Sequence, residues 1–291
     1  MPKTLDDHEL PQAPAGRAPG DDRLLAAVRE DVRQTLRTPW IEPAFDKAAE
    51  VPLFLTAAWS AIRPNVGRSF LTLARAIRCE AADSARIQSP PDLRKQLESE
   101  LSENELRRVE HVSLAAHLAA AKAQIVVHVL YRAARRERLG GTGREEPPVR
   151  RGVPEADRWM GTQPEPDASH SVLEESAAAL DLLVAPTPLR LLARWPEAAR
   201  RVWDEVRAPI EADRWKPAAA RLRRMVLGGV TGLPHPVELQ WSALRSRGFG
   251  EEERMAMVAA MAGYDAAMPT ATLLAAFGWV AFGAPDLGAE A

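Results

Sequence analysis

Six histidines are the first residues in this chain whose chemistry could serve metal binding or proton transfer: His8, His111, His117, His128, His170 and His235. None of them has the His-x-His or His-Glu-x-x-His spacing that places two imidazoles together on one element. Three of them, at 111, 117 and 128, fall on one predicted helix without carboxylates at ligand spacing. We therefore predict no metal site and interpret these three as core or surface histidines.

Cys79 is the single cysteine, so the chain can form no internal disulfide and has no Cys-x-x-Cys pair for redox chemistry or zinc. Arg75, Arg78 and Arg86 lie near it in sequence, and positive charge favours a thiolate. A nucleophilic thiolate also needs a general base, and none is evident. We interpret Cys79 as a small residue, buried or half-buried, at a helix end.

Two further patterns have structural explanations. The run Gly228–Gly232 lacks the preceding strand and the lysine of a phosphate-binding loop, so we interpret it as a helix terminator and turn. The arginine clusters at 132–138 and 221–224 have no interleaved aromatic residues and are typical of solvated helix faces. No Gly-x-Ser-x-Gly serine motif is present.

Composition restricts the class of protein. The 291 residues are 46% apolar and 27% charged, which is typical of a globular protein. With 38 basic and 40 acidic side chains, the net charge of −2 gives no general attraction to nucleic acid or to an anionic membrane. No apolar run approaches the roughly 18–20 residues that span a bilayer, and residues 1–22 lack a signal-peptide core. We expect a cytoplasmic protein.

The elements that must position any site are helices. Ala, Leu, Arg and Glu dominate, prolines divide the chain into short segments, and alternating strand patterns are missing, so we predict an all-α fold. Ser102 to Glu105 fits a capping box that begins the longest helix. The predicted organisation is a tail (1–22), a helical unit (23–139), a Pro/Gly-rich linker (140–170), a second helical unit (171–283) and a tail (284–291).

The two helical units resemble each other in the spacing of their landmarks. Pro52 and Trp59 are seven residues apart, as are Pro196 and Trp203. In each unit a proline-rich break and an acidic helix start follow, so the features recur at offsets of about 144–148. We predict two related helical halves about a pseudo-twofold axis. A pocket is expected where they meet.

Three segments carry a resemblance to a known family: Glu30–Trp40, Leu192–Pro196 and Asp204–Pro209. They are similar to motifs of the configuration-independent DL-2-haloacid dehalogenases, and the similarity runs in register from about residue 28 to about 282. The resemblance implies an all-α fold of two sequence-related halves, dimer formation, and no cofactor or metal. It implies hydrolysis of small 2-halo carboxylic acids, in which an aspartate activates the water that attacks the α-carbon directly.

The resemblance also implies roles for individual positions. Trp40 matches a pocket tryptophan, and Thr187 stands where the family has a serine just before its catalytic aspartate. At the position of the aspartate itself this chain has Pro188, which cannot accept a proton. If the local helix differs, Asp181 is a substitute base, and Asp265 is a second one.

Three more positions belong to the implied pocket. The family's water-holding asparagine falls at Ala120, and a pocket phenylalanine falls at Pro43. Tyr264 lies next to the position of a pocket tyrosine. The chain therefore matches the family better in its scaffold than in the residues that carry the family's chemistry. Loss of a positioned general base typically lowers the catalytic rate by about 10²–10⁴.

Two functions remain open from the sequence. One is a dehalogenase-like hydrolase of small carboxylic acids that uses a different base. The other is a non-catalytic protein that binds a small ligand or acid between the halves, lined by Trp40, Thr187 and Tyr264. Nucleic acid and membrane are not expected as partners, and a homodimer is an open expectation.

Overall fold

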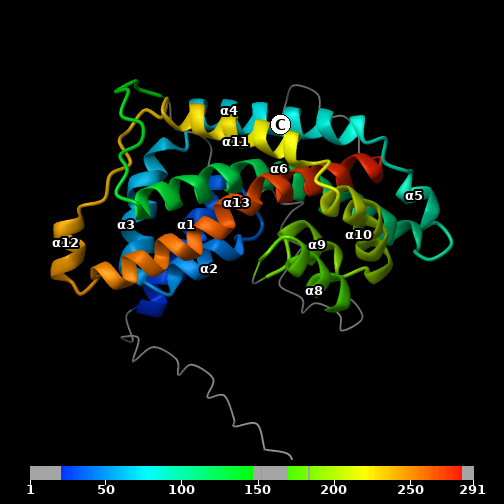
Figure 1. Ribbon diagram of the computed structural model, residues 1–291, viewed down its shortest axis with the longest axis horizontal. Coiled ribbons are helices and arrows are strands. Elements are labelled where there is room, and N and C mark those ends of the chain that lie inside the picture. Colours follow the sequence, from blue (N-terminus) through cyan, green and yellow to red (C-terminus); the bar gives the residue numbers. More distant parts are fainter. Residues whose placement is uncertain (1–20, 147–151, 153–169, 183, 284–291) are drawn as a thin grey trace, which may run out of the picture.

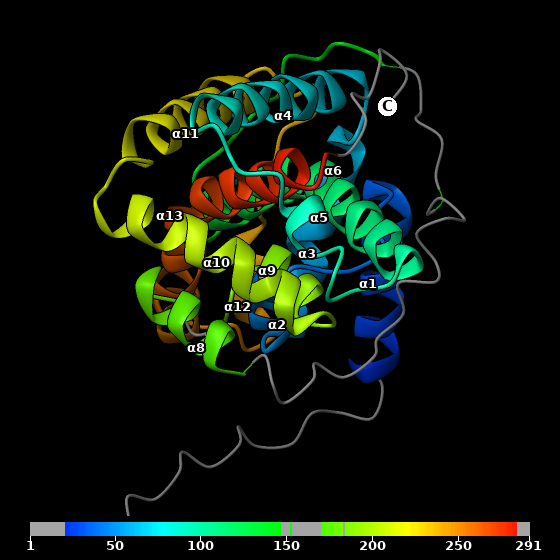
Figure 2. The same cartoon turned by 90° about the vertical axis from the view of Figure 1, so that its right-hand side faces the viewer.

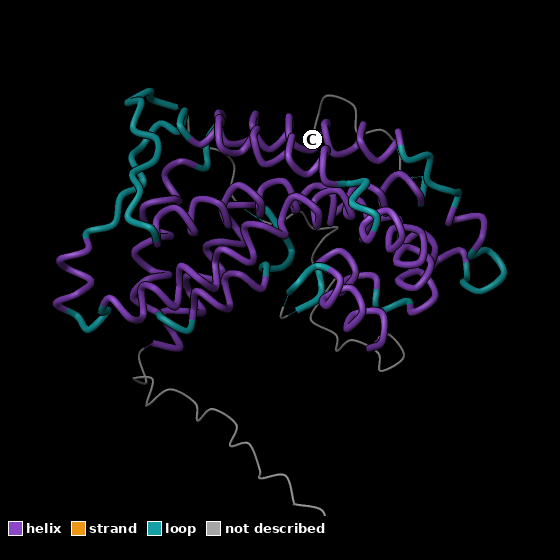
Figure 3. Tube along the Cα trace, in the orientation of Figure 1, coloured by secondary structure: helices purple, strands orange, loops and turns teal. Residues whose placement is uncertain are grey.

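The computed structural model describes residues 21–146, 152, 170–182 and 184–283, and these fold into helices joined by turns and loops (Figure 1, Figure 3). Within these ranges the one β contact is an isolated bridge between Leu139 and Val237, so the predicted all-α fold is confirmed. The elements are α1 (Asp21–Leu36), α2 (Pro43–Ala49), α3 (Pro52–Ile62), η1 (Arg63–Asn65), α4 (Arg68–Ile87), α5 (Leu93–Gln96), α6 (Glu103–Ala134), α8 (His170–Ala179), α9 (Thr187–Leu192), α10 (Pro196–Glu211), α11 (Lys216–Val230), α12 (Trp241–Ser246) and α13 (Glu251–Ala281).

The two long helices α6 and α13 pack against each other through the middle of the molecule (Figure 1). α6 begins at the predicted capping box, in which Ser102 accepts from the backbone N–H of Glu105 and the Glu105 side chain accepts from that of Ser102. Between the helices, the Thr272 hydroxyl donates to the Gln124 side chain at 2.9 Å, a buried pair that satisfies both groups.

α6 is, by length and composition, apolar enough to cross a membrane, which the sequence expectation did not foresee. However, 83% of its most apolar window is buried inside the fold. Its apolar surface is therefore accounted for by its place in the core.

Shorter helices cover the central pair on two sides. α4 and α11 lie side by side on one of them, and the two perpendicular views agree (Figure 1, Figure 2). The Arg221 guanidinium of α11 joins them by donating to Glu80 at 2.6 Å and to Ser84 at 3.2 Å. α9 contacts both central helices, and α2 contacts α13. The starts of α2 and α9 are thereby held close to the α6–α13 core.

The first and second parts of the chain contain the same three-residue cluster, Trp59–Asp31–Arg63 and Trp203–Glu175–Arg207. Trp59 donates to Asp31 at 2.8 Å and Trp203 to Glu175 at 3.1 Å, in both cases across 28 residues. The arginine that follows each tryptophan by four positions pairs with the same carboxylate. The two clusters agree with the predicted sequence spacing, while the pseudo-twofold axis itself stays a prediction.

The start of the predicted linker is packed against both parts of the chain. Leu139 and Val237 exchange both backbone hydrogen bonds, at 3.2 and 2.8 Å. Gly140 has a φ of 67°, and a Cβ there would lie 2.8 Å from the His235 carbonyl, so this turn requires glycine. Glu146 accepts from the backbone N–H of Ser69 at 2.9 Å. Residues 147–151 and 153–169 of the predicted linker, most of the first predicted tail and all of the second lie outside the described residues.

Trp203 provides a test of this packing, since its side chain is completely buried and hydrogen-bonded. We expect Trp203→Ala to lower the free energy of unfolding by about 3–5 kcal/mol, through the lost apolar contacts and the cavity that remains. Denaturant unfolding at pH 7 measures this loss, and Trp59→Ala is the matched variant. A loss below about 1 kcal/mol would contradict the described packing.

Candidate functional site

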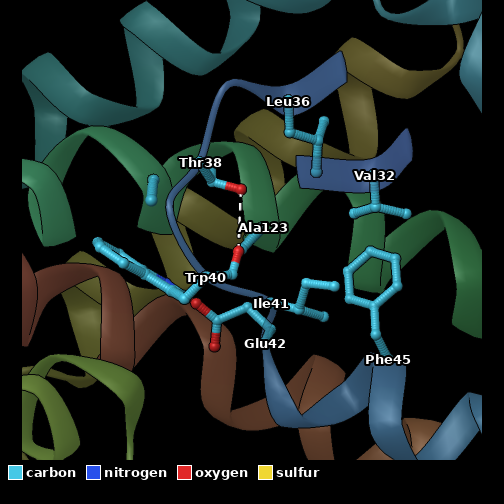
Figure 4. A pocket seen from close by; sticks show the side chains of 9 residues that line it. Val32, Leu36, Thr38, Trp40, Ile41, Glu42, Phe45 and Ala123 are labelled. Carbon is cyan, nitrogen blue, oxygen red and sulfur yellow. Dashed lines mark hydrogen bonds between the residues drawn. The ribbon is translucent and has the colours of Figure 1, made fainter. Parts of the chain in front are cut away.

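A short connection between α1 and α2 positions the first half of the site. After α1 ends, the backbone turns at Arg37, which has a φ of 54°. The Thr38 hydroxyl then donates to the Trp40 carbonyl at 3.0 Å, which fixes the loop (Figure 4). Pro43 occupies the start of α2, where its fixed φ suits a first helical turn. Trp40 and Glu42 are therefore presented by a constrained segment.

The Glu42 carboxylate is the ionisable group at the centre of this region, beside Trp40 (Figure 4). It accepts a hydrogen bond from the Thr187 hydroxyl at 2.5 Å, and another from the Trp40 side chain. Thr187 is the first residue of α9 and lies 145 positions later in the chain. This contact joins the start of α9 to the residue before α2.

Burial raises the pKa of Glu42 above its ordinary value. The hydrogen bonds from Thr187 and Trp40, and the positive charge of Arg190, act in the opposite direction but do not cancel the effect of burial. A carboxylate with a raised pKa is a stronger base than an exposed one, and nearer the pH at which enzymes work. Two donors leave free acceptor positions among the roughly four of a carboxylate.

Glu42 contributes to the lining of a cavity of about 10 Å³, which is about the space that one water molecule needs. Glu42 is the one ionisable residue in its lining, and its carboxylate points toward Trp40, away from Val32, Leu36 and Phe45 (Figure 4). The lining consists of Val32, Leu36, Thr38, Trp40, Ile41, Glu42, Phe45, Ala119 and Ala123.

Small side chains form the wall beyond Trp40. Ala116 and Ala120 of α6 cluster with Ala275 of α13, and Trp40 and Leu191 pack against them. The three alanines are at most 4% exposed and form a buried group separate from the main core. The structure therefore brings Trp40 and Ala120 together, as the predicted pocket requires, although Ala120 offers only a methyl group.

Arg190 and Tyr264 complete the polar surroundings. The pKa of the half-buried Tyr264 is raised by burial and by the negative charges of Asp46 and Glu50, whereas Arg190 lowers it. Since Arg190 also acts on Glu42, one positive charge lies near both groups. A guanidinium in this place suits recognition of a carboxylate.

Of the two remaining positions implied by the resemblance, Pro43 begins α2 and Pro188 is the second residue of α9. Pro188 is buried, directly after Thr187, and has no group that could take a proton. The starts of α2 and α9 therefore each carry a proline, and Glu42 and Thr187 are the polar side chains that meet there.

Asp265, one of the two suggested substitute bases, lies in a different environment from Glu42. It is 5% exposed and held between His128 Nδ1 at 2.8 Å and Arg223 at 3.4 Å. This carboxylate links α13 to α6 and α11, which is a structural arrangement. Its partners account for its burial without any substrate.

Asp181, the other suggested base, is exposed just after α8 and has a φ of 52°. It lines a cavity of about 330 Å³ together with Asp213, Trp215 and Lys216. That cavity shares no lining residue with the one beside Glu42.

Sequence reasoning missed Glu42 and misplaced Cys79. The sequence did contain a signal for Glu42, because this carboxylate lies two residues after Trp40 and directly before Pro43, which can begin a helix. The prediction that Cys79 is a buried or half-buried helix-end residue is wrong, because it is exposed within α4. His117 and His128 are buried and His111 is exposed, in agreement with their interpretation as core or surface histidines.

No protein-family model matches the sequence, and no curated protein matches it. Solved structures with a similar fold include three that carry the name D-2-haloacid dehalogenase. The complex of a D-2-haloacid dehalogenase mutant with D-2-CPA has a TM-score of 0.77 at 16% identity, and covers 92% of this chain and 96% of that one. The complex of D-2-haloacid dehalogenase with L-LA has a TM-score of 0.78 at 15% identity, with coverages of 97% and 99%.

The third, a D-2-haloacid dehalogenase mutant, has a TM-score of 0.76 at 15% identity, with the same coverages of 97% and 99%. The fold of this chain is therefore that of a haloacid dehalogenase, over nearly its whole length. The identity is low, so the likeness establishes the fold, and the site must be argued from its own residues.

Because the pKa of Glu42 is raised, replacing its carboxylate with a neutral side chain should stabilise the fold by an amount that depends on pH. The fold favours the protonated carboxyl, so ionisation costs stability as pH rises through the folded-state pKa. Glu42→Gln should raise Tm at pH 8, and the gain should vanish below the ordinary glutamate pKa of about 4.3. Calorimetry across this range measures it. Glu50→Gln, at an exposed site after the same helix, should give no such gain, and a lower Tm for Glu42→Gln at pH 8 would contradict the assignment.

Proposed function

We propose that this chain is a hydrolytic 2-haloacid dehalogenase in which Glu42 is the general base. The observation that carries the proposal is the Glu42 carboxylate, which has a raised pKa and is held by Thr187 and Trp40 beside the charge of Arg190. The fold supports it, because the similar structures are of proteins named D-2-haloacid dehalogenases. The proposal replaces Asp181 and Asp265 with a carboxylate that adjoins Trp40.

The place of Glu42 explains how the base could move within one fold. The family resemblance puts the base at Pro188, the second residue of α9. Glu42 precedes the first residue of α2, and its oxygen lies 2.5 Å from the Thr187 hydroxyl, the neighbour of Pro188 in sequence. The Glu42 carboxylate, which precedes α2, therefore lies close to the start of α9, where the resemblance places the catalytic carboxylate.

In the proposed reaction the substrate carboxylate pairs with Arg190, and its alkyl part lies against the alanine wall and Leu191. Such a wall suits a short aliphatic acid because it is apolar and closely packed. The Arg190 charge and the alanine wall together orient the acid so that its α-carbon lies near a water molecule hydrogen-bonded to Glu42. Holding two reactants in this orientation supplies much of an enzyme's rate enhancement.

The chemical step is a direct displacement at the α-carbon. Glu42 accepts a proton from water as the water oxygen forms a bond to the α-carbon, and the carbon–halogen bond breaks on the opposite side. The halide leaves with the bonding electron pair, and Glu42 later returns its proton to solvent. The α-carbon inverts, so a D-2-haloacid gives the L-2-hydroxy acid.

The second candidate function is binding of a small carboxylic acid without turnover. The observation in its favour is that Pro188, Ala120 and Pro43 are all without a proton-accepting side chain. The pocket would then use Arg190 for the acid, and Glu42 would be a structural carboxylate. Halide release separates the two candidates directly.

We expect the purified protein to release chloride from D-2-chloropropionate and to form L-lactate. Glu42→Gln should lower kcat by about 10²–10⁴ because the water loses its base. Asp181→Asn is the matched control and should keep kcat, since Asp181 lines a different cavity. Chloride release and chiral chromatography of the product measure both. Ligand-induced stabilisation without any chloride release would favour the binding function instead.

Thr187→Val tests the environment of the base. Loss of the Thr187 hydroxyl removes a hydrogen bond that lowers the pKa of Glu42, so that pKa should rise further. Because Glu42 works ionised, the acidic limb of the pH–kcat profile should shift to higher pH, while kcat on the plateau is retained within about tenfold. An unchanged limb would show that a different group controls it.

A further inference from the structure

Lys122 is the single lysine, arginine, aspartate or glutamate between Glu110 and Arg132, in the apolar middle of α6. Its side chain is half-buried, and its ammonium group donates to the backbone carbonyl of Leu36 at 2.8 Å. The two residues lie 86 positions apart, and Leu36 is the last residue of α1. Burial of a charged group is costly unless it is paired or hydrogen-bonded, so a lysine in this place calls for an explanation.

The carbonyl that Lys122 contacts belongs to the end of α1, where the last four carbonyls have no donor within the helix. Other groups satisfy two of them: the Arg33 carbonyl accepts from the Thr38 N–H at 3.1 Å, and the Gln34 carbonyl accepts from the Gly152 N–H at 2.9 Å. The ammonium group satisfies a third. A positive charge at this end of a helix also interacts favourably with the helix dipole.

The segment that directly follows Leu36 presents Trp40 and Glu42 (Figure 4). The backbone turns at Arg37, with a φ of 54°, and the Thr38 hydroxyl donates to the Trp40 carbonyl at 3.0 Å. Because these contacts make the segment stiff, a displacement of the end of α1 would be passed on to Trp40 and Glu42.

The turns of α6 around Lys122 contact the same segment through alanines. Ala119 and Ala123 line the cavity to which Glu42 contributes, and Trp40 packs against Ala120. A methyl group allows close approach but sets no direction, whereas a hydrogen bond fixes two groups at a defined distance and angle. The contact from Lys122 therefore sets where the end of α1 lies along α6.

We propose that Lys122 is a positioning residue, which fixes the Trp40–Glu42 segment on α6 through the Leu36 carbonyl and so keeps the Glu42 carboxylate against Thr187. As a statement about the general base, the inference rests on the proposed function. As a statement about the place of Glu42, it can be measured without any turnover.

A double-variant cycle on the full chain measures the burial of Glu42 through stability. Burial makes the Glu42 carboxylate costly at pH 8, so Glu42→Gln should raise Tm there. In a Lys122→Met background the segment can move and water can reach Glu42, so we expect less than half of that gain in Tm to remain. Calorimetry at pH 8 on the two single variants, the double variant and the unaltered chain gives the difference.

The direction of the change separates positioning from two simpler roles. If Lys122 acted on Glu42 through its charge, its removal would raise the pKa of Glu42 and enlarge the gain. If Lys122 stabilised the fold and nothing more, Lys122→Met would lower Tm and leave the gain unchanged. Either result would overturn the proposal.

Lys95→Met is the matched control, since Lys95 is exposed on α5 and its replacement removes the same charge. It should leave the gain from Glu42→Gln unchanged, and an equal loss in both backgrounds would also count against the proposal. Lys122→Ala is the second variant, for use if Lys122→Met does not fold, because alanine suits the interior of a helix. It should reduce the gain in the same way.

Kinetics provide a separate readout on the proposed reaction. With Glu42 displaced, Lys122→Met should lower kcat by about tenfold or more and leave KM within about threefold, since Arg190 still pairs with the substrate. The acidic limb of the pH–kcat profile should move to lower pH as Glu42 becomes hydrated. A raised KM with unchanged kcat would contradict positioning of the base. If the unaltered chain releases no chloride, the proposed function fails, and the stability cycle alone decides whether Lys122 positions Glu42.

Discussion

The hydrogen bond from Thr187 to Glu42 is the contact on which the rest of the site depends. It joins residues 145 positions apart and brings the starts of α2 and α9 together on the α6–α13 core. The bond holds a carboxylate whose burial raises its pKa, so the fold keeps a group there that costs stability when ionised. Proteins retain such groups chiefly at functional sites, where a strained or costly arrangement serves chemistry.

The comparison with solved D-2-haloacid dehalogenases separates scaffold from chemistry. At 15–16% identity the fold is shared over nearly the whole chain. The core of α6 and α13 needs only apolar side chains of suitable size, and many sequences satisfy that requirement. A general base has a stricter requirement, since its oxygen must lie within hydrogen-bond reach of the attacking water. In this chain the starts of α2 and α9 meet in one place. In the proposed function, Glu42 from one start supplies that oxygen, and Thr187 from the other start donates a hydrogen bond to it.

Local rules allowed much of the fold to be predicted from the sequence, whereas contacts across long separations had to be seen. The capping box at Ser102 depends on neighbouring residues and begins α6 as expected. Pro52 and Pro196, two of the prolines expected to divide the chain, are the first residues of α3 and α10. Glu42 was missed because its partner Thr187 becomes a neighbour only through packing. Cys79 was misplaced because the apolar spacing of α4 does not fix which face an isolated small residue occupies.

A single turnover of D-2-chloropropionate in H₂¹⁸O, with enzyme in excess, tests most directly whether water attacks the α-carbon itself or Glu42 first forms an ester with it. We expect the first L-lactate formed to carry ¹⁸O and the peptide containing Glu42 to stay unlabelled, because the water oxygen goes straight to the α-carbon. Unlabelled lactate with ¹⁸O recovered in Glu42 would show that this carboxylate is a nucleophile. Absence of lactate altogether would contradict the proposed dehalogenase activity.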